Sequence, residues 1–185
     1  PGDRGGRKAQ MSRELRPRGP SVEGRARARY REAVPEEERF PFDVLTGLTA
    51  DPDCRFLWMD VDGSFKGIAY VILTDDLLFL LYLAVTPGDR DCGLGSDALW
   101  LVKCMAGGRR VFLNAEAVDE QADNIGQRLR RTRFYDRNGF APQCTYRTPD
   151  GQRYLLFSWG GSVTPEEAFA LYGSKLDSAG VTGVE

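Results

Sequence analysis

Three apolar runs in the middle of the chain predict a meander of β-strands. Residues 54–61 (CRFLWMDV) and 65–73 (FKGIAYVIL) flank Asp62-Gly63, a dipeptide that favours a two-residue hairpin turn. Residues 77–85 (LLFLLYLAV) contain almost no polar position. A strand that is apolar on both faces is typical of the interior of a covered sheet, so we expect this strand to be central.

The second half of the chain alternates between helical and strand patterns. A helix is expected at 94–106, because five apolar residues recur there at helical spacing and two glycines follow. The five are Leu94, Ala98, Leu101, Val102 and Met105. The three tryptophans, Trp58, Trp100 and Trp159, are expected in the core or on a sheet face. The further elements expected are a strand at 110–117, a helix at 124–138, a hairpin of strands at 140–148 and 152–160, and a helix at 164–176.

The N-terminal part of the chain has a less regular pattern. A short strand is expected at residues 12–17, a helix opened by Ser21 at 21–34, and a broken helical segment at 35–48. A meander followed by strand–helix–strand order implies a mixed sheet with helices packed on it. The expected organisation is a disordered leader or expression remnant at 1–10, one domain at 11–176 and a flexible tail at 177–185.

The composition is that of an ordinary globular domain. The chain has 185 residues, of which 42% are hydrophobic and 28% charged, and its formal net charge is −2. Such a balance gives no global attraction to nucleic acid or to an anionic membrane. No apolar run reaches the length of a transmembrane helix and no signal peptide is evident, so we expect a cytoplasmic protein.

The chain contains no histidine, which narrows its possible chemistry. Ser-His-Asp and Cys-His catalysis are excluded, as are metal sites with histidine ligands. Acid–base steps must use carboxylates, Tyr, Lys, Cys or water. The four cysteines form no CxxC pair, and we interpret them as reduced thiols rather than as ligands of a metal. They are Cys54, Cys92, Cys104 and Cys144.

The loop between the central strand and the next helix has the composition of an anion site. The stretch AVTPGDRDCGLGSDAL, residues 84–99, places Gly93 and Gly95 just before the helix. Glycines allow close approach to the backbone, and the first amides of a helix have no partners within it. These amides and the helix dipole suit a pyrophosphate. The alternative is a surface turn that joins a strand to a helix.

One interpretation of this loop is a dinucleotide site. Residues 93–98 match G-x-G-x-x-A, and Glu116 follows 23 residues after Gly93, where an acid that binds ribose would sit (116 − 93). Two features weaken it. Seven residues, 86–92, separate the strand from the first glycine, and few strand–helix units follow. It leaves an NAD(P)-dependent oxidoreductase as an alternative function.

Two motifs together resemble the GNAT superfamily of acyl-CoA N-acyltransferases. The spacing V-x-P-x-x-R-x-x-G-x-G at Val85–Gly95 resembles the coenzyme A loop of that family. The segment RFYDRNGFAP, residues 133–142, looks like its LYxKxGF motif. The resemblance covers roughly residues 12–160, and the order of elements agrees with it. It implies an α/β (α+β) fold with a mixed, mostly antiparallel sheet of about seven strands and helices on both faces.

The resemblance implies which residues bind coenzyme A. The backbone of the central strand would pair with the pantetheine arm, the loop amides would hold the pyrophosphate, and arginines of the last long helix would reach phosphates. The strand residues are Leu83, Ala84 and Val85. The loop residues are Arg90, Asp91, Cys92, Gly93, Leu94, Gly95 and Ser96, and the helix arginines are Arg128 and Arg131. Relatives often have Asn at the position of Arg128.

The resemblance also implies the catalytic groups. Tyr135 matches the tyrosine that gives a proton to the leaving thiolate; the alternative is an aromatic residue that packs on the sheet. Relatives that modify histones carry a glutamate where this chain has Phe79, so the base must lie elsewhere. Glu116 is our candidate, or else it is a carboxylate paired with nearby arginines. Glu37, Glu38 and Asp60 are candidates for binding a cationic amine, or else part of a solvated acidic turn.

The function that this resemblance implies is acetyl transfer from acetyl-CoA to a primary amine by direct attack, without a metal. The acceptor is left open between a small molecule and a peptide or protein, and the oligomeric state between monomer and homodimer. A non-catalytic coenzyme A sensor is a second alternative, because the central strand carries no acid.

Overall fold

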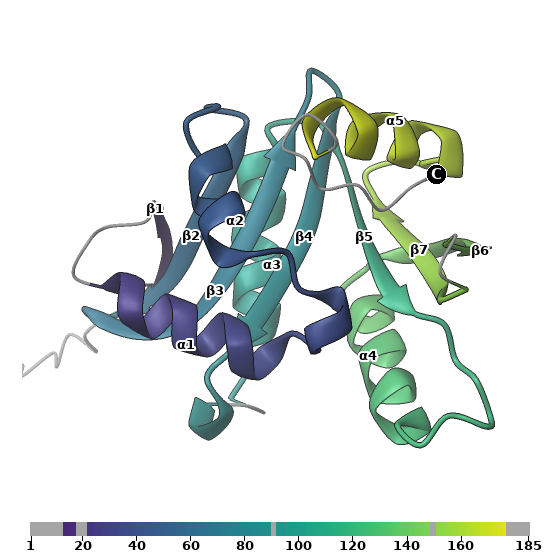
Figure 1. Ribbon diagram of the computed structural model, residues 1–185, viewed down its shortest axis with the longest axis horizontal. Coiled ribbons are helices and arrows are strands. Elements are labelled where there is room, and N and C mark those ends of the chain that lie inside the picture. The colour runs from purple at the N-terminus through teal and green to yellow at the C-terminus, as the bar shows by residue number, and fades with distance from the viewer. Residues whose placement is uncertain (1–12, 18–21, 90–91, 149–150, 177–185) are drawn as a thin grey trace, which may run out of the picture.

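The computed structural model describes residues 13–17, 22–89, 92–148 and 151–176, and its centre is one seven-stranded sheet. The strand order is β1-β2-β3-β4-β5-β7-β6 (Figure 1). Among the described strands, only β4 and β5 pair in parallel. The strands are β1 (Arg13–Pro17), β2 (Cys54–Val61), β3 (Ser64–Leu73), β4 (Leu77–Val85), β5 (Arg110–Glu116), β6 (Ala141–Arg147) and β7 (Arg153–Trp159). The predicted mixed, mostly antiparallel sheet is confirmed.

Helices cover both faces of the sheet. Two clusters of buried apolar side chains lie on opposite faces; α1, α2 and α5 contribute to one, and α3 and α4 to the other (Figure 1). The helices are α1 (Glu23–Ala33), α2 (Phe42–Leu48), α3 (Leu94–Ala106), α4 (Ile125–Arg137) and α5 (Pro165–Lys175), with short 3-10 turns η2 (Glu36–Glu38) and η3 (Pro87–Asp89).

Local signals explain the β2–β3 turn and the start of α5. Asp62 and Gly63 both have positive φ, 50° and 79°, as a two-residue hairpin turn between β2 and β3 requires. Thr164 caps α5 in a capping box with Glu167. The predicted cap Ser21 lies outside the described residues, as do the predicted leader at 1–10 and tail at 177–185.

The buried face of α3 is rotated relative to our expectation. Leu99 and Ala106 are fully buried, whereas Leu101 and Met105 are only partly covered. The buried positions of α3 still follow the helical period, but the stripe is centred one residue away. Trp100 is 64% exposed on the opposite side of the helix, so its assignment to the core or to a sheet face was wrong.

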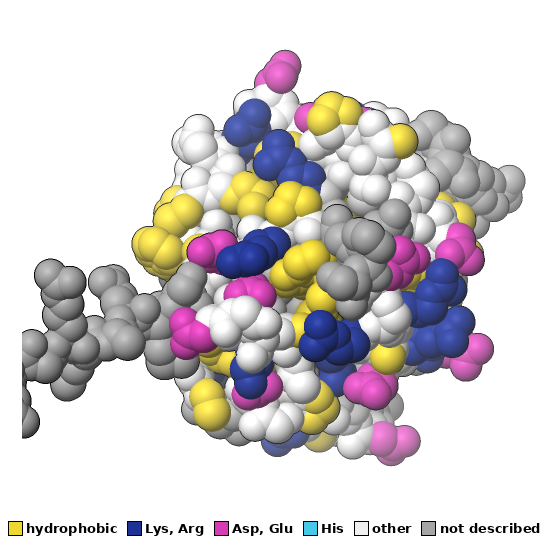
Figure 2. All heavy atoms as spheres, turned by 90° about the vertical axis from the view of Figure 1, so that its left-hand side faces the viewer, with side chains coloured by type: hydrophobic (Ala, Val, Ile, Leu, Met, Phe, Trp, Pro, Cys, Tyr) yellow, Lys and Arg dark blue, Asp and Glu magenta, His cyan; other side chains and the backbone are white. Residues whose placement is uncertain are grey.

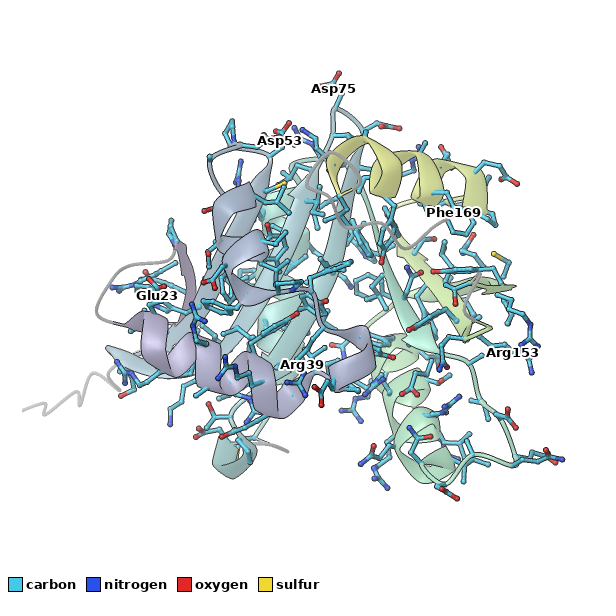
Figure 3. The ribbon with its side chains drawn as sticks, in the orientation of Figure 1. Glu23, Arg39, Asp53, Asp75, Arg153 and Phe169 are labelled. Atoms are coloured by element: carbon cyan, nitrogen blue, oxygen red, sulfur yellow. The ribbon has the colours of Figure 1, made fainter. Side chains whose placement is uncertain are left out.

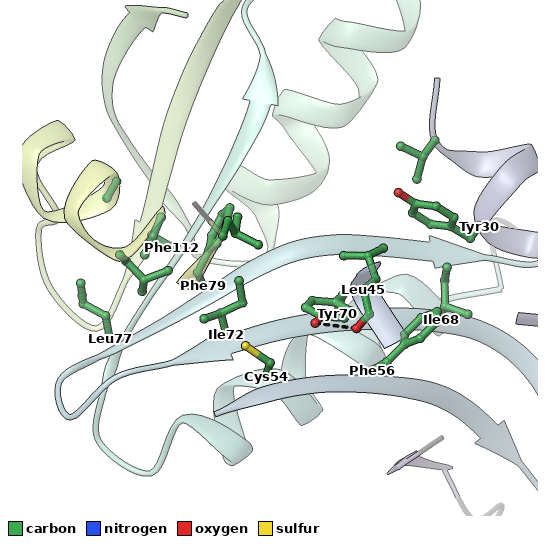
Figure 4. Close-up of a cluster of buried hydrophobic side chains, with 14 of the residues drawn as sticks. Tyr30, Leu45, Cys54, Phe56, Ile68, Tyr70, Ile72, Leu77, Phe79 and Phe112 are labelled. Carbon is green, nitrogen blue, oxygen red and sulfur yellow. Dashed lines mark hydrogen bonds between the residues drawn. The ribbon is translucent and has the colours of Figure 1, made fainter. Parts of the chain in front are cut away.

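Aromatic side chains fill the core beside the junction of β4 and β5 (Figure 4). The Phe79 and Phe112 rings stack with centroids 4.6 Å apart, across the last residue pair of the two strands. The Tyr70 hydroxyl is buried and donates a hydrogen bond to the carbonyl oxygen of Leu45 at 3.0 Å, which ties α2 to the sheet. The sheet is therefore rigidly packed up to the point where β4 and β5 separate.

The surface at the β1 edge carries both signs of charge. Figure 2 shows acidic and basic side chains interspersed there, in agreement with ion pairs such as Arg16–Glu14 and Arg27–Asp43. None of the helices in the described part of the chain combines the length and apolar character that a membrane crossing needs.

Candidate active site

The sheet opens into a fork between β4 and β5. The two strands pair only through Leu77–Arg110, Leu78–Val111 and Phe79–Phe112, and then diverge (Figure 1). A bulge in the β3–β4 register, where Tyr70 faces Tyr82 but Val71 faces Leu80, adds a bend to β4 at this point. Residues 81–85 consequently have no partner on β5, and their backbone groups on that side stay available.

Gly67 on β3 maintains this arrangement. It pairs with Val85, and a Cβ at this position would lie 2.4 Å from the carbonyl oxygen of Ala84. Only a glycine permits such close approach between β3 and the splayed end of β4.

The loop after β4 leads into the N-terminus of α3. Gly93 is the cap residue and has a φ of 82°, a conformation that favours glycine. The Asp97 amide donates to the Gly93 carbonyl, so the amides of the three residues between them have no intrahelical partner. Gly95 is needed for a different reason, because a Cβ there would lie 3.1 Å from the ring of Phe134. Cys92 is exposed, and Arg90 and Asp91 lie outside the described residues.

A cavity of about 350 Å³ passes through the fork. Its wall includes side chains from α1, η2 and α5 on one face of the sheet and from α4 on the other, so it joins the two faces. The residues that line it include Glu38, Arg39, Phe40, Leu81, Tyr82, Leu83, Asn114, Arg131, Tyr135, Tyr146, Tyr154, Phe169 and Tyr172.

Tyr135 is held against the sheet by aromatic neighbours. Its ring packs on Phe134, Phe140 and Phe157, with centroids 5.3, 6.3 and 5.4 Å away. Burial raises the pKa of its phenol above the ordinary value of 10.0, and the charge of Arg131 opposes this. No described residue hydrogen-bonds the hydroxyl. The group is therefore protonated at neutral pH and available to donate to a molecule in the cavity.

Glu116 lies at the end of β5 in a network of ion pairs; it is not part of the cavity wall, although its partner Arg131 is. Its oxygens lie 2.9 Å from an Arg128 nitrogen and 3.0 Å from an Arg131 nitrogen, and the Asn124 amide donates to it at 3.3 Å. Arg128 also donates to the Ala117 carbonyl at 2.8 Å. This geometry favours the alternative in which Glu116 anchors α4 to the sheet. Arg128 is likewise engaged by contacts within the protein, with Glu116 and with the Ala117 carbonyl.

Among the described side chains, the acidic one that lines the cavity is that of Glu38. The Tyr154 hydroxyl donates to its carboxylate at 3.1 Å, and the Tyr82 hydroxyl donates to its backbone carbonyl at 2.8 Å. The charge of Glu38 contributes to the raised pKa of Tyr172, so these groups are neighbours. Glu37 belongs to the same 3-10 turn, but its side chain lies outside the described part of the structure.

Asp60, a sequence candidate for binding the acceptor, lies outside the cavity wall. Its carboxylate accepts a hydrogen bond from the Gly63 amide at 2.8 Å and lies 3.9 Å from Arg16. It therefore stabilises the β2–β3 hairpin, and it is absent from the wall of the cavity.

The sequence analysis missed two polar residues in the wall, Arg39 and Asn114. The Arg39 Nε and both side-chain polar atoms of Asn114 are buried without a hydrogen-bond partner of ordinary geometry among the described residues. The Asn114 amide faces the Tyr172 hydroxyl. A polar residue within the apolar pattern of β5 was the available signal for Asn114, whereas Arg39 resembled any surface arginine.

Three more phenols of the cavity wall have a raised pKa. Burial raises the pKa of Tyr82, Tyr146 and Tyr172 well above the ordinary value of a tyrosine. In the described ranges no group of His, Cys, Asp and Glu residues could hold a metal ion.

Solved structures resemble this chain in fold, although no protein-family model and no curated protein sequence matches it. A GNAT-family protein from Bacteroides thetaiotaomicron has a TM-score of 0.67 and 21% identity over 93% of this chain and 99% of its own. An aminoglycoside 6′-N-acetyltransferase solved with coenzyme A has a TM-score of 0.62 and 14% identity, over 84% of this chain and 99% of its own. Naa50 from Arabidopsis thaliana, in complex with the bisubstrate analogue CoA-Ac-MVNAL, has a TM-score of 0.61 and 15% identity, over 80% of this chain and 98% of its own.

Proposed function

From the premise that this chain has the GNAT fold, we propose that it is an N-acetyltransferase that moves an acetyl group from acetyl-CoA to a primary amine. The observation that carries the proposal is the cavity through the fork of β4 and β5. Such an opening allows a donor held on one side of the sheet to meet an acceptor that enters from the other. The solved relatives with coenzyme A or a bisubstrate analogue support this assignment.

The chain offers two features that fit coenzyme A. The unpaired edge of β4 at residues 81–85 can hydrogen-bond the amides of the pantetheine arm, as an added strand would. The first amides of α3, together with the positive end of its dipole, suit the pyrophosphate. The backbone assignments at Leu83, Ala84 and Val85 and at the loop residues therefore stand as part of the proposal.

The reaction must move two protons while it exchanges one bond for another. An ammonium group loses a proton, the free amine attacks the thioester carbonyl, a C–N bond forms and the C–S bond breaks. The nitrogen loses its second proton and the sulfur gains one. The net products are the N-acetyl amine, the free thiol of coenzyme A and one proton released to solvent.

Tyr135 is the proposed acid for the departing sulfur. Its hydroxyl is protonated at neutral pH and free of protein hydrogen bonds in the described chain. It projects from α4, the helix that also supplies the Phe134 ring packed on Gly95 of the loop. Among the cavity phenols, Tyr82 and Tyr154 already donate to Glu38, which leaves Tyr135 the better placed donor on the side of the coenzyme A loop.

Glu38 replaces Glu116 as the proposed proton acceptor. Glu116 has both oxygens engaged by arginines, and protonation would cost it those ion pairs. Glu38 reaches the cavity with a carboxylate that receives a hydrogen bond from Tyr154 and can accept further ones from an ammonium. It would accept the proton directly or through one water.

The dinucleotide interpretation loses its structural basis. A doubly wound fold needs a largely parallel sheet, and this sheet has one parallel pair. Its ribose-binding acid would be Glu116, which is paired with two arginines. A cytoplasmic location and a monomeric or homodimeric state remain predictions.

The test is turnover with a panel of amines. The protein is incubated with acetyl-CoA and amino acids, aromatic amines, polyamines, aminoglycosides or peptides, and free thiol and acetylated product are measured. We expect one class to give both products in equal amounts. Tight binding of acetyl-CoA without acetylation of any class would instead support a coenzyme A sensor.

A further inference from the structure

The acceptor side of the cavity contains two opposite charges on neighbouring residues. Glu38 and Arg39 both line the cavity, at the connection between η2 and α2. Figure 3 shows Arg39 in front of the sheet, next to the C-terminal end of α1. The Glu38 carboxylate is held by the Tyr154 hydroxyl at 3.1 Å, which fixes the negative group on the β7 side of the cavity.

Arg39 lines the cavity, and no described carboxylate forms an ion pair with it. Its Nε is buried and has no hydrogen-bond partner among the described residues. A buried donor on a guanidinium group is costly when it is left unpaired. Arginine presents a planar fork that matches a carboxylate through two parallel hydrogen bonds. Arg39 is thus suited to an anionic group that arrives with the acceptor.

The remaining wall of the acceptor side is apolar and aromatic. Tyr146 stacks near Tyr154, with centroids 6.0 Å apart, and meets Phe169 edge-on at 5.2 Å. Phe40 and Leu81 complete this wall. An ammonium beside Glu38 would also lie against ring faces, which attract cations. A large apolar side chain would bury itself against the same rings.

These three features together specify an acceptor. We propose that it is a free α-amino acid with a large apolar or aromatic side chain, whose ammonium contacts Glu38 and whose carboxylate contacts Arg39. This inference rests on the proposed acetyltransferase function and narrows its substrate class. Acetylation joins the amino nitrogen to the acetyl carbon and releases the thiol of coenzyme A, so the product is the N-acetyl amino acid.

The charge pattern disfavours the other amine classes. A polyamine or aminoglycoside would bring several cations beside Arg39 and beside Arg131, the second arginine in the wall. A peptide N-terminus replaces the α-carboxylate by a neutral amide, and Arg39 would then have no charged partner.

A substrate series tests the inference without any mutation. L-Phenylalanine, L-phenylalaninamide and phenethylamine share the aromatic ring and the primary amine, and only the first carries a carboxylate. With saturating acetyl-CoA, we expect kcat/KM for L-phenylalanine to exceed that of the other two by about 10- to 100-fold. L-Tyrosine, L-leucine and L-methionine are measured alongside, with spermidine, kanamycin and a short Met-initiated peptide as competing classes.

Variants of Arg39 test whether this residue recognises the carboxylate of the substrate. Arg39→Gln should lower kcat/KM for the amino acids by about 10- to 100-fold and leave phenethylamine unchanged, while Arg39→Lys should restore part of the loss. Arg55→Gln is the matched control, because Arg55 is an exposed arginine on β2 that donates to the Pro52 carbonyl away from the cavity. Thermal melting and acetyl-CoA binding confirm that each variant is folded.

Two kinds of result would overturn the inference. One is the absence of carboxylate recognition, seen as equal kcat/KM for the acid, the amide and the amine, or as an Arg39→Gln variant that loses the same fraction of kcat/KM with all three. The other is a preference for spermidine, kanamycin or the peptide; in that case the acetyltransferase function stands and only the amino acid class is wrong. If acetyl-CoA fails to bind the wild type at all, the proposed function falls as well.

Discussion

Replacing Tyr135 by phenylalanine removes one hydroxyl from the cavity and leaves the ring packing in place. The ring centroids of Phe134 and Phe157 lie 5.3 and 5.4 Å away, and phenylalanine retains both contacts. The hydroxyl makes no hydrogen bond with a described residue, so its loss should change the free energy of unfolding by less than about 1 kcal/mol.

The kinetic effect of this substitution should be far larger. A general acid contributes about 10²- to 10⁴-fold, which corresponds to about 2.7–5.4 kcal/mol at about 1.36 kcal/mol for each factor of ten. We therefore expect kcat of Tyr135→Phe to fall by that factor, with acetyl-CoA affinity unchanged because the hydroxyl acts on the leaving sulfur. Thiol release measures the first quantity and calorimetry the second.

The pH profile and a matched variant sharpen this test. Burial raises the pKa of Tyr135 above 10.0, so the wild type should not lose activity through ionisation of this phenol below that pH. Tyr146→Phe removes another cavity phenol, on β6, and should lower kcat much less. A Tyr135→Phe variant that keeps more than about a tenth of the wild-type kcat would refute the assignment.

Three further substitutions test the supporting structure. Gly67→Ala places a Cβ 2.4 Å from a backbone oxygen of β4 and should cost about 1–3 kcal/mol in a urea titration, whereas Gly24→Ala meets nothing within 4 Å and should not destabilise. Glu116→Gln should lower stability by about 1–3 kcal/mol through loss of its two arginine partners and reduce kcat less than Tyr135→Phe does; a larger kinetic effect would return Glu116 to the role of base. The pKa of Glu167 lies below its usual 4.5, because Arg110 and then the backbone of Thr164 hydrogen-bond its carboxylate. The carboxylate of Glu167 stabilises the folded protein above pH 4.5, and this stabilisation is lost as the pH falls through the lower pKa of the folded state. Glu167→Gln should therefore flatten the decline of the melting temperature at acid pH. An unchanged decline would contradict this.

The sequence predicted the fold well because its local signals agree with one another. The Asp62-Gly63 turn, the apolar run at Leu77–Val85 and the cap at Thr164 each specify one element with a known backbone geometry. The two motifs then placed the loop and α4 on the sheet. The face of α3 was misjudged by one position, because Leu101 and Leu99 are equally apolar and only packing decides between them.

The candidate site was only partly predictable, because a cavity depends on contacts between distant segments. A local motif singled out Tyr135, and this residue lines the cavity. Glu38 was one of three equivalent glutamates until Tyr154, 116 positions later, engaged its side chain. Arg39 had no sequence signal at all, since its lack of a partner among the described residues is a property of the fold. Glu116 was chosen by its position at a strand end, which could not reveal that α4 brings two arginines to it.

Binding of acetyl-CoA is the first requirement of the proposed acetyltransferase function. Calorimetry is run on the wild type and on a Gly93→Asp/Gly95→Asp variant, whose carboxylates would repel a pyrophosphate at the start of α3. Thermal melting first confirms that the variant is folded, because Gly93 has a φ of 82° and Gly95 packs under Phe134. The account predicts that the wild type binds and that the variant does not. Absence of wild-type binding at millimolar acetyl-CoA would contradict it.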